Sequence, residues 1–540
     1  MESDEKGRIA NGKPGSACLL LVRLQSSAVP ATASTEPDAA SDGAGAPAPA
    51  SPPRRAGRML ARAFVSFHPS SMPPMARANY RRELAASALL PFALAIFEGG
   101  VLGVLLKNGF EGVAPRGALT VAVALVATAP AFGNISSFLW APLWHGQPLA
   151  RAIASMQAMV AILCGIVALA PATTPGMWMM AVGAVAARSC WAGVITLRST
   201  AWNQNYPRSH RARITGKFAT IQVIGIGVLG LGMGWAVDHS GGASAGAVGV
   251  VGDAGALEDP LVGGQMNWMG FRILAITGAI FGLFGAWWWS RVRIRGQRAL
   301  QEAERVAGVA RLSLLHPGGM IRTLREDRAF GAYMLWMMLL GSGNLMVAAP
   351  LVLALRDRFD MNNLAGIAIA SSIPYLMMPV MIPLWARLLE ASHIIRFRVV
   401  HSWVFVGANV ALLVAALTGN APLLYLSAVA KGLAFAGGAL AWNLGHLDFA
   451  PPHKASQYMG VHVTLTGVRG LITPFVGVAV YEGLEAMAPA AGGGAWVFAL
   501  CTALTLAGAL GFMSLSRRVD PRLGPHQGPM EVAPPSRVAE

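Results

Sequence analysis

Four charged residues stand inside stretches of the sequence that are otherwise apolar. They are Glu98 in "IFEGG", Arg188 in "AARSCW", Lys431 in "VAKGLAF" and Arg469 in "GVRGLI". A charge at the centre of a lipid bilayer costs about 2.5 to 3.5 kcal/mol, so such residues usually face a protein interior and have a function. A carboxylate there can take up a proton, and the basic groups can bind an anion.

The blocks around these charges have the length of membrane-spanning helices, which need about 20 apolar residues each. Of 540 residues, 54% are hydrophobic and 13% are charged, whereas a soluble domain carries about 25% charged residues. We therefore expect an all-α polytopic membrane protein. The expected spans number twelve, at about 85–106, 118–140, 152–171, 176–197, 218–238, 269–289, 329–355, 364–384, 399–417, 421–445, 461–481 and 494–515.

Basic residues gather in every second loop. They crowd the segments before the first span and after the fourth, sixth, eighth and last, whereas the loop at 239–268 has no Lys or Arg. By the positive-inside rule, both termini are expected in the cytoplasm, and the protein in a bacterial inner membrane. The formal net charge of +16 is therefore interpreted as topology, and no nucleic-acid partner is expected.

Two short phrases occur twice at nearly the same separation. "PLW" begins at 142 and again at 383, and "AWN" begins at 201 and again at 441. Such matches also arise by chance in an apolar chain, but their places relative to the spans favour a six-helix unit used twice in one orientation. The expected parts are a disordered cytoplasmic tail at 1–84, a six-helix bundle at 85–289, a cytoplasmic loop at 290–328, a second bundle at 329–516 and a cytoplasmic tail at 517–540.

With this organisation, residues 80–518 resemble the major facilitator superfamily of secondary transporters. The family carries a cluster of Gly, Asp and Arg or Lys after the second helix and again after the eighth. Here "PLWHGQPLAR" keeps Gly146 and Arg151 without the acid, and "PLWARLLEASHIIR" keeps Arg387 with Glu390 in place of the aspartate. The resemblance implies a gating or packing role for Arg151, Arg387 and Glu390, and the missing acid argues against a symmetric charge latch.

The resemblance also implies a central cavity lined by the first, fourth, seventh and tenth helices. Glu98, Arg188 and Lys431 fall on three of these spans, at similar depths near the bilayer midplane. Asn344, in the polar "GSGN" stretch, falls on the seventh. We therefore predict that these four residues bind substrate or couple its movement to an ion.

A structural explanation stands beside each functional one. Glu98 and Arg188 could form a buried ion pair with no other role. Arg188 and Lys431 could be satisfied by backbone carbonyls. For Arg469, which is close to a helix end, snorkelling or packing between the halves competes with function as a gating residue.

Other motifs do not indicate sites. The glycines of "GIGVLGLGMGW" have dinucleotide-fingerprint spacing but stand within a span, where they favour close helix packing. His446, Asp448, His453 and His462 lack zinc-site spacing, and the four cysteines show no paired spacing. We expect neither a metal nor a cofactor.

The expected function is secondary active transport of a small solute by alternating access, coupled to protons and directed at an anionic substrate. A drug-type exporter of the same fold and a non-transporting receptor or scaffold remain the alternatives. The sequence contains no HExxH or P-loop motif, so we expect no enzyme. The expected partners are the solute, protons and the lipid bilayer, with the protein a monomer.

Overall fold

The structure is a computed structural model that describes residues 65–144, 146–239, 268–299, 301–302, 317–450, 455–489 and 492–518. Within these ranges it contains helices and no strand. Twelve segments of the described chain are helical, apolar and long enough to cross a membrane. The expected all-α polytopic fold is thereby confirmed. The predicted disorder at 1–64 and the predicted tail beyond 518 lie outside the described residues.

The N-terminal half begins earlier than expected. Its first helix starts at Pro74 rather than at 85, because Pro74 suits the first turn of a helix and the segment that follows packs against α8 and α9. The helices of this half are α2 (Pro74–Leu89), α3 (Pro91–Leu94), α4 (Gly99–Phe110), α5 (Arg116–Leu143), α6 (Leu149–Ala168), α7 (Thr174–Asn205), α8 (Arg208–His239) and α9 (Trp268–Ser290).

The C-terminal half follows a short helix, α11 (Pro317–Glu326), that lies within the predicted central loop. Its elements are α12 (Arg328–Met346), α13 (Ala348–Asp357), α14 (Asn363–Ile367), the π-helical turn η4 (Ala368–Ser372), α15 (Ile373–Glu390), α16 (Ile394–Thr418), α17 (Ala421–Leu444), α18 (Ala455–Met487) and α19 (Val497–Arg518). Short 3₁₀ turns occur at η1 (Pro69–Ser71), η5 (Gly445–Asp448) and η8 (Gly493–Trp496).

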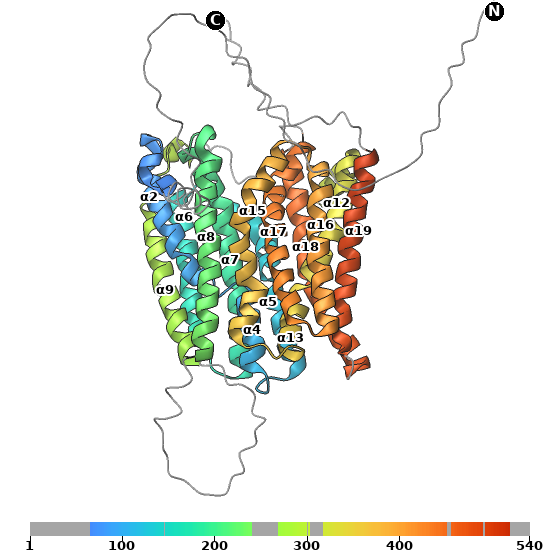
Figure 1. Cartoon of the computed structure of the whole chain (residues 1–540). Helices are drawn as coiled ribbons and strands as arrows, with labels where there is room; N and C mark the ends of the chain where they lie inside the picture. The colour runs from blue at the N-terminus through green and yellow to red at the C-terminus, as the bar shows by residue number, and fades with distance from the viewer. Residues whose placement is uncertain are drawn as a thin grey trace, which may run out of the picture. The chain divides into compact units, whose positions relative to one another are not determined.

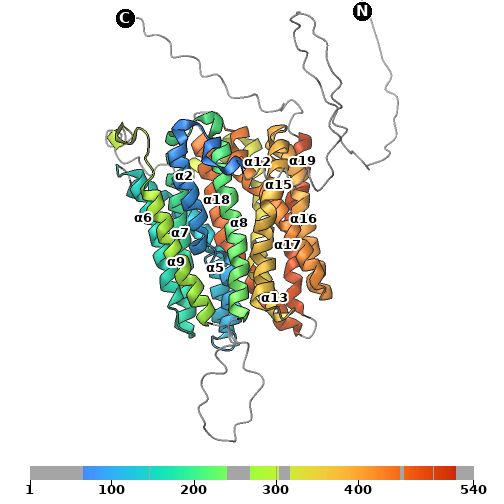
Figure 2. The same cartoon turned by 60° about the vertical axis from the view of Figure 1, so that its left-hand side comes forward.

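The long helices run side by side (Figures 1 and 2). We call the end where α2 begins and α19 ends the terminal end, and the opposite end the distal end. Corresponding helices of the two halves pack against corresponding neighbours. α5 packs on α7 as α15 packs on α17, and α6 packs on α9 as α16 packs on α19. This is the pattern that a repeated six-helix unit requires. Superposition of the halves stays a prediction.

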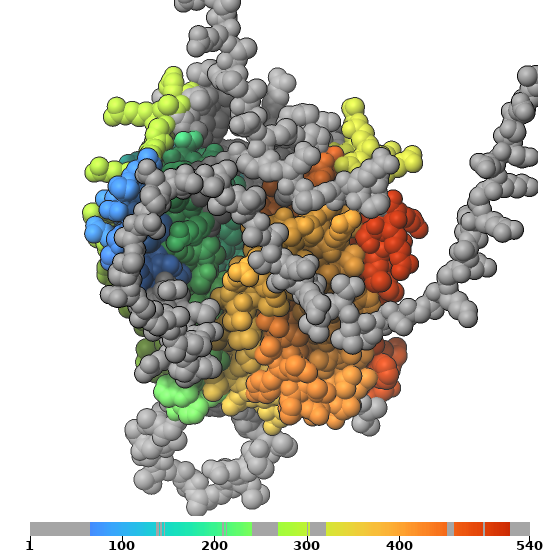
Figure 3. All heavy atoms as spheres, turned by 45° about the horizontal axis from the view of Figure 1, so that its top comes forward, coloured from blue at the N-terminus to red at the C-terminus, as the bar shows by residue number. Residues whose placement is uncertain are grey.

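Contacts between the halves run along three helices of the N-terminal half. α5 packs against α18, α8 against α14 and α15, and α4 against α13. Figure 3 shows the two groups beside each other, blue to green and orange to red. Apolar side chains stay exposed on the outer helices, as at Ile273, Ile276, Ile280 and Phe284 of α9. Their spacing of three and four residues marks one helix face, which suits contact with lipid.

Glycines of α8 form part of this interface. A Cβ atom added to Gly234 would lie 2.7 Å from Leu364 Cα, and one added to Gly230 would lie 2.7 Å from Ser372 Oγ. At Gly227 the added atom would lie 2.8 Å from Leu376 Cγ. All three neighbours belong to the C-terminal half. The interpretation of this glycine run as a close-packing surface is therefore confirmed.

Candidate functional site

Glu98 lies where the first membrane helix is interrupted. The chain leaves helical geometry after α3, and Glu98 itself has extended backbone angles of φ −72° and ψ 130° before α4 begins at Gly99. Pro91 lacks an N–H, and Gly99 and Gly100 favour helices poorly, so the local sequence weakens the helix here. At Gly100 an added Cβ would lie 2.8 Å from the carbonyl oxygen of Ala370, so the interruption lies against the other half.

Arg188 of α7 forms an ion pair with Glu98. The distance from Arg188 Nη2 to Glu98 Oε2 is 2.8 Å, and the two side chains are 12% and 14% exposed. The structure thus brings together two of the residues that the sequence predicted. A buried pair of this kind is stable only while both charges are present, so loss of either one is costly.

The C-terminal half contributes Tyr375 to this pair. The phenol of Tyr375 interacts with both the Glu98 carboxylate and the Arg188 guanidinium. Tyr375 follows the π-helical turn η4 and Pro374, which has no N–H to continue an ordinary helix. An ion pair of one half is therefore in contact with a side chain of the other.

Asn344 and Lys431 lie elsewhere in the C-terminal half. Asn344 of α12 donates to the Leu340 carbonyl at 3.0 Å and accepts from Asn409 at 3.4 Å. Lys431 of α17 is 8% exposed, with its Nζ 5.9 Å from the centre of the Phe435 ring. In the part of the chain that the structure describes, Lys431 makes no ion pair with Glu98. Of the three charges predicted to share one layer, Glu98 and Arg188 meet, and Lys431 does not join them.

The predicted gating residues differ from one another in environment. Arg151, Arg387 and Glu390 are exposed, and no ion pair joins any of them to another described residue. Arg469 is 7% exposed, so it does not snorkel to the surface. It lines a cavity of about 390 Å³ in the C-terminal half, together with Asn344, Tyr375 and Arg398.

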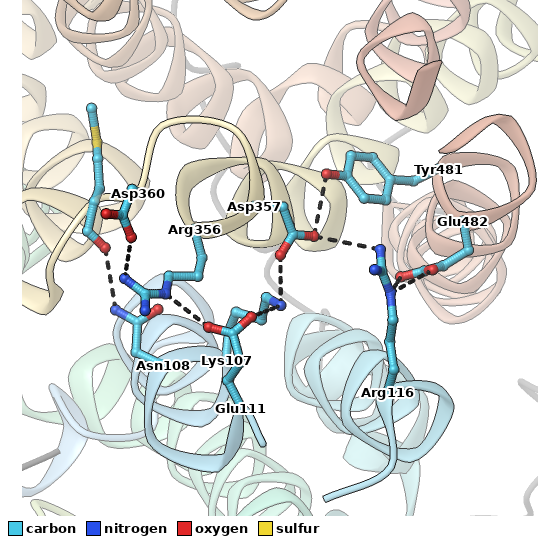
Figure 4. A network of polar contacts seen from close by, with 10 residues as sticks. Lys107, Asn108, Glu111, Arg116, Arg356, Asp357, Asp360, Tyr481 and Glu482 are labelled. Atoms are coloured by element: carbon cyan, nitrogen blue, oxygen red, sulfur yellow. Dashed lines mark hydrogen bonds and ion pairs between the residues drawn. The ribbon is translucent and has the colours of Figure 1, made fainter. Parts of the chain in front are cut away.

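A cluster of ion pairs joins the halves at the distal end (Figure 4). Lys107, in the last turn of α4, lies 2.6 Å from Asp357 of α13 and 2.8 Å from Glu111. Arg356 of α13 reaches Glu111 at 2.8 Å. Burial alone would raise the pKa of Glu111, but its hydrogen bonds to Lys107 and Arg356 lower that pKa below its ordinary value.

The same cluster continues along α5 and α18. Arg116 at the start of α5 pairs with Glu482 of α18 at 3.0 Å and lies 3.7 Å from Asp357. Tyr481 donates to Asp357 at 3.4 Å (Figure 4). Every ion pair between the halves in the described ranges belongs to this cluster. These pairs hold the two halves together at the distal end, and we call this arrangement the closed distal end.

A helix cap adds to the distal closure. Asp238, in the last turn of α8, accepts from the backbone N–H of Asn363 at 3.2 Å and of Leu364 at 2.8 Å. These amides open α14, so a carboxylate of one half caps a helix of the other. Asn108 of α4 also donates to the Asn363 side chain at 3.1 Å.

Among the described residues, no three His, Cys, Asp or Glu side chains come together in a group that could hold a metal ion. His453 lies outside those residues. Asp448 accepts from the backbone N–H of Ile394 at 2.6 Å, where α16 begins.

Several polar residues with clear partners were missed by sequence reasoning. Arg398 lies just before the predicted ninth span at 399–417, but α16 begins at Ile394 and Arg398 is 2% exposed. Tyr375 had no signal beyond its place after Pro374. Glu83 was assigned to the tail but is 1% exposed and accepts from Trp202 at 2.7 Å. A helix start extended to Pro74 would have placed Glu83 within a span.

No family model and no curated protein sequence matches the chain. Solved structures do match in fold. A variant of the nucleoside transporter NupG is 16% identical, covers 81% of this chain and 99% of its own, and has a TM-score of 0.56. The xylose transporter XylE from E. coli, in a partially occluded inward-open conformation, is 12% identical over 83% of this chain and 98% of its own, with a TM-score of 0.55.

A POT family transporter in complex with 5-aminolevulinic acid is 13% identical over 81% of this chain and 96% of its own, with a TM-score of 0.56. At these identities the likeness concerns the fold. The chain has the fold of twelve-helix transporters of the major facilitator type, which confirms the fold that the resemblance implied.

Proposed function

We propose that the protein is a secondary active transporter that moves a small solute across a bacterial inner membrane by alternating access. The proposal rests on one observation above all. The Glu98 and Arg188 ion pair stands at a break in a membrane helix and is in contact with Tyr375 of the other half. A titratable pair at the surface between two halves can link protonation to their relative movement.

The conformation supports the assignment of an alternating-access cycle. The described ion pairs between the halves lie at the distal end, where they close the protein. Basic loops favour a cytoplasmic location for the terminal end, so the described state corresponds to one closed toward the outside. Opening toward the outside then requires these pairs to separate.

Glu98 is the proposed proton acceptor. A neutral Glu98 no longer attracts the Arg188 guanidinium, which leaves a positive charge without its partner in a low-dielectric site. An anionic substrate, or contact with another acceptor, then stabilises that charge. Proton binding and substrate binding would thus favour the same conformation, which is the requirement for coupled transport.

The structural neighbours are named as transporters of nucleosides, xylose and other small solutes. Their fold similarity supports a transport function for this chain and leaves the substrate to be determined by its own residues. A drug-type exporter would show flux of cationic solutes, and a receptor or scaffold would show no flux.

Reconstituted vesicles test the proposal. A panel of labelled anionic, neutral and cationic solutes is presented to proteoliposomes with an imposed proton gradient, with and without a proton ionophore. We expect accumulation of at least one anionic solute that the ionophore abolishes. Glu98→Gln should lose accumulation and retain exchange of solute across the membrane.

Glu326→Gln provides the control, because Glu326 is a 51% exposed carboxylate outside the spans that pairs with Arg322. It should accumulate solute as the wild type does. Undiminished accumulation by Glu98→Gln would refute the coupling role of Glu98. No flux of any solute would favour the scaffold alternative.

A further inference from the structure

Two arginines in the C-terminal half are buried without a carboxylate partner. Arg398 of α16 is 2% exposed and Arg469 of α18 is 7% exposed. Neither forms an ion pair within the described residues. Both line the same cavity, and the two guanidinium groups are close enough to repel each other.

The contacts of Arg398 leave its charge uncompensated. Its Nη1 donates to His401 Nδ1 at 3.3 Å, and His401 Nε2 then donates to the Ala434 carbonyl at 2.8 Å. With one nitrogen accepting and the other donating, His401 is a neutral imidazole. The Nε of Arg398 is buried and has no hydrogen-bond partner.

Arg469 is also held in place without being neutralised. Its Nη1 donates to the backbone carbonyl of Met337, and its Nε is buried without a partner. The guanidinium fits only because residue 341 is a glycine, since an added Cβ at Gly341 would overlap it. The backbone of α12 therefore fixes where this positive charge lies.

Two neighbouring side chains also have unused polar atoms. The Tyr333 hydroxyl is buried without a partner and interacts electrostatically with Arg469. Both ring nitrogens of His462, which is 1% exposed, are likewise without partners. Two buried cations that repel each other are unfavourable unless a negative charge accompanies them.

The cavity beside the arginines has the size and lining of a small-molecule site. Its volume is about 390 Å³, within the range of roughly 300 to 1,000 Å³ that such sites occupy. Phe405, Phe435 and Trp442 form its apolar wall. Guanidinium groups bind carboxylate and phosphate oxygens through paired hydrogen bonds, and the apolar wall suits a flat hydrocarbon body.

We propose that this cavity binds an organic anion, whose carboxylate or phosphate group contacts the guanidinium groups of Arg398 and Arg469. Its apolar body packs against Phe405, Phe435 and Trp442. Lys431, where the sequence predicted one of the substrate contacts, is not among the residues that line this cavity. Binding of an anion to this cavity does not depend on the proposed function. The identification of that anion as the transported solute rests on the proposed function.

Thermal melting of the purified full-length protein measures binding without transport. The probes are benzoate, phenyl phosphate, inorganic phosphate, the neutral benzyl alcohol and the cation benzylammonium. We expect benzoate or phenyl phosphate to raise the melting temperature by roughly 3 °C at saturation, because ligands stabilise the folded state that binds them. The probe that raises the melting temperature more shows whether the cavity prefers a carboxylate or a phosphate group. Benzyl alcohol and benzylammonium should have no effect.

Five variants, Lys431→Gln among them, locate the anion. Arg398→Gln and Arg469→Gln should each weaken binding by about tenfold or more, the loss expected for one charge-assisted contact. Gly341→Ala keeps every charge but displaces the Arg469 guanidinium, so it should weaken binding as well. Lys217→Gln is the matched control, because Lys217 is a buried cation of the other half, at 8% exposure, and should bind normally.

The results separate the possibilities. Stabilisation by benzylammonium alone, or anion binding unchanged in Gly341→Ala and both arginine variants, would overturn the proposal. Loss of binding in Lys431→Gln with normal binding in the arginine variants would move the site to Lys431 and overturn it too. Equal stabilisation by inorganic phosphate and phenyl phosphate would refute the apolar wall. If an arginine variant fails to fold, the affinity of Gly341→Ala for the anion still tests the proposal. Binding without vesicle flux would refute transport and leave the anion site standing.

Discussion

Lys107 Nζ lies 2.6 Å from Asp357 Oδ1, and the two residues belong to opposite halves of the protein. The side chains are 5% and 19% exposed, so this pair is shielded from water more than the other contacts around it. It stands at the centre of the distal cluster, with Glu111 on one side and Arg116 on the other. The closed distal end therefore depends on a small set of charges whose members can be changed one at a time.

Asp357→Asn should destabilise the closed conformation. The change leaves the buried Lys107 charge with one fewer acceptor, a loss of about 1–3 kcal/mol. The measurement is the melting temperature of the purified protein, which should fall by several degrees. Asp360→Asn is the comparison: Asp360 also pairs with an arginine, at 2.5 Å from Arg356, but it is 88% exposed and should contribute little. Equal effects of the two substitutions would contradict the role of burial.

Acid should loosen the distal end through Glu111. Burial alone raises the pKa of Glu111, but its hydrogen bonds to Lys107 and Arg356 lower it below the ordinary value. A lowered pKa in the paired state means that pairing stabilises the closed end above the ordinary glutamate pKa of about 4.3. This stabilisation is lost as the pH falls through the lowered pKa.

The melting temperature, measured as a function of pH, tests whether stability falls as the pH falls. The wild-type value should decline as the pH falls below about 4, and Glu111→Gln should show a lower starting value with a shallower decline. Parallel curves for the two proteins would assign the acid sensitivity to other carboxylates.

Alanine should be tolerated at Gly232 of α8 and not at Gly234, which lies two residues further on and about 200° around the helix. Gly234→Ala would place a methyl group 2.7 Å from Leu364 Cα, a backbone atom that cannot rotate away. A Cβ atom added at Gly232 has no neighbour within 4 Å. Gly232→Ala should therefore raise the free energy of unfolding by about 0.5–1 kcal/mol, because alanine has the better helix propensity. Melting temperatures should therefore fall for Gly234→Ala and hold or rise for Gly232→Ala. A fall in both would argue against contact between the halves at Gly234.

The buried ion pair should behave as one unit. Glu98→Gln and Arg188→Gln each leave one charge without its partner, at a cost of about 3–5 kcal/mol. The double variant removes both charges, so its melting temperature should lie above the value expected from adding the two single losses. Strict additivity would mean that the two residues do not interact in solution. Tyr375→Phe, which keeps both charges, should change stability less than either single variant.

The fold could be predicted from the sequence because the bilayer requires long apolar segments, and these are visible residue by residue. The same logic failed at the ends of spans. Charged residues such as Glu83 and Arg398 lower the local hydropathy and therefore fall outside the predicted spans, although tertiary contacts bury them. Burial of a charge depends on neighbours from distant helices, which a local window does not contain.

The sequence predicts how deep each residue lies along its helix, and the candidate site could be predicted only where residues at equal depth also touch. Glu98 and Arg188 fall at similar depth on helices of one half, and they meet. Lys431 has a similar predicted depth but points toward Phe435 and the neighbourhood of Cys501. Rotation about the helix axis decides which residues converge, and in a helix that is apolar all round the sequence carries little information about that rotation.

The glycine face of α8 has a consequence for kinetics. Where two helices interlock through large side chains, relative movement requires each rotamer to leave its hole, and the activation barrier grows with the number of interlocked groups. At Gly227, Gly230 and Gly234 α8 contributes no side chain to the contact, so no α8 rotamer would have to change at these positions if the halves move. In the proposed transport cycle, the barrier to opening the distal end would then come mainly from the charged contacts around Asp357 and from the Asp238 cap of α14. Because the Lys107 and Asp357 side chains are shielded from water, added salt should screen their attraction only weakly.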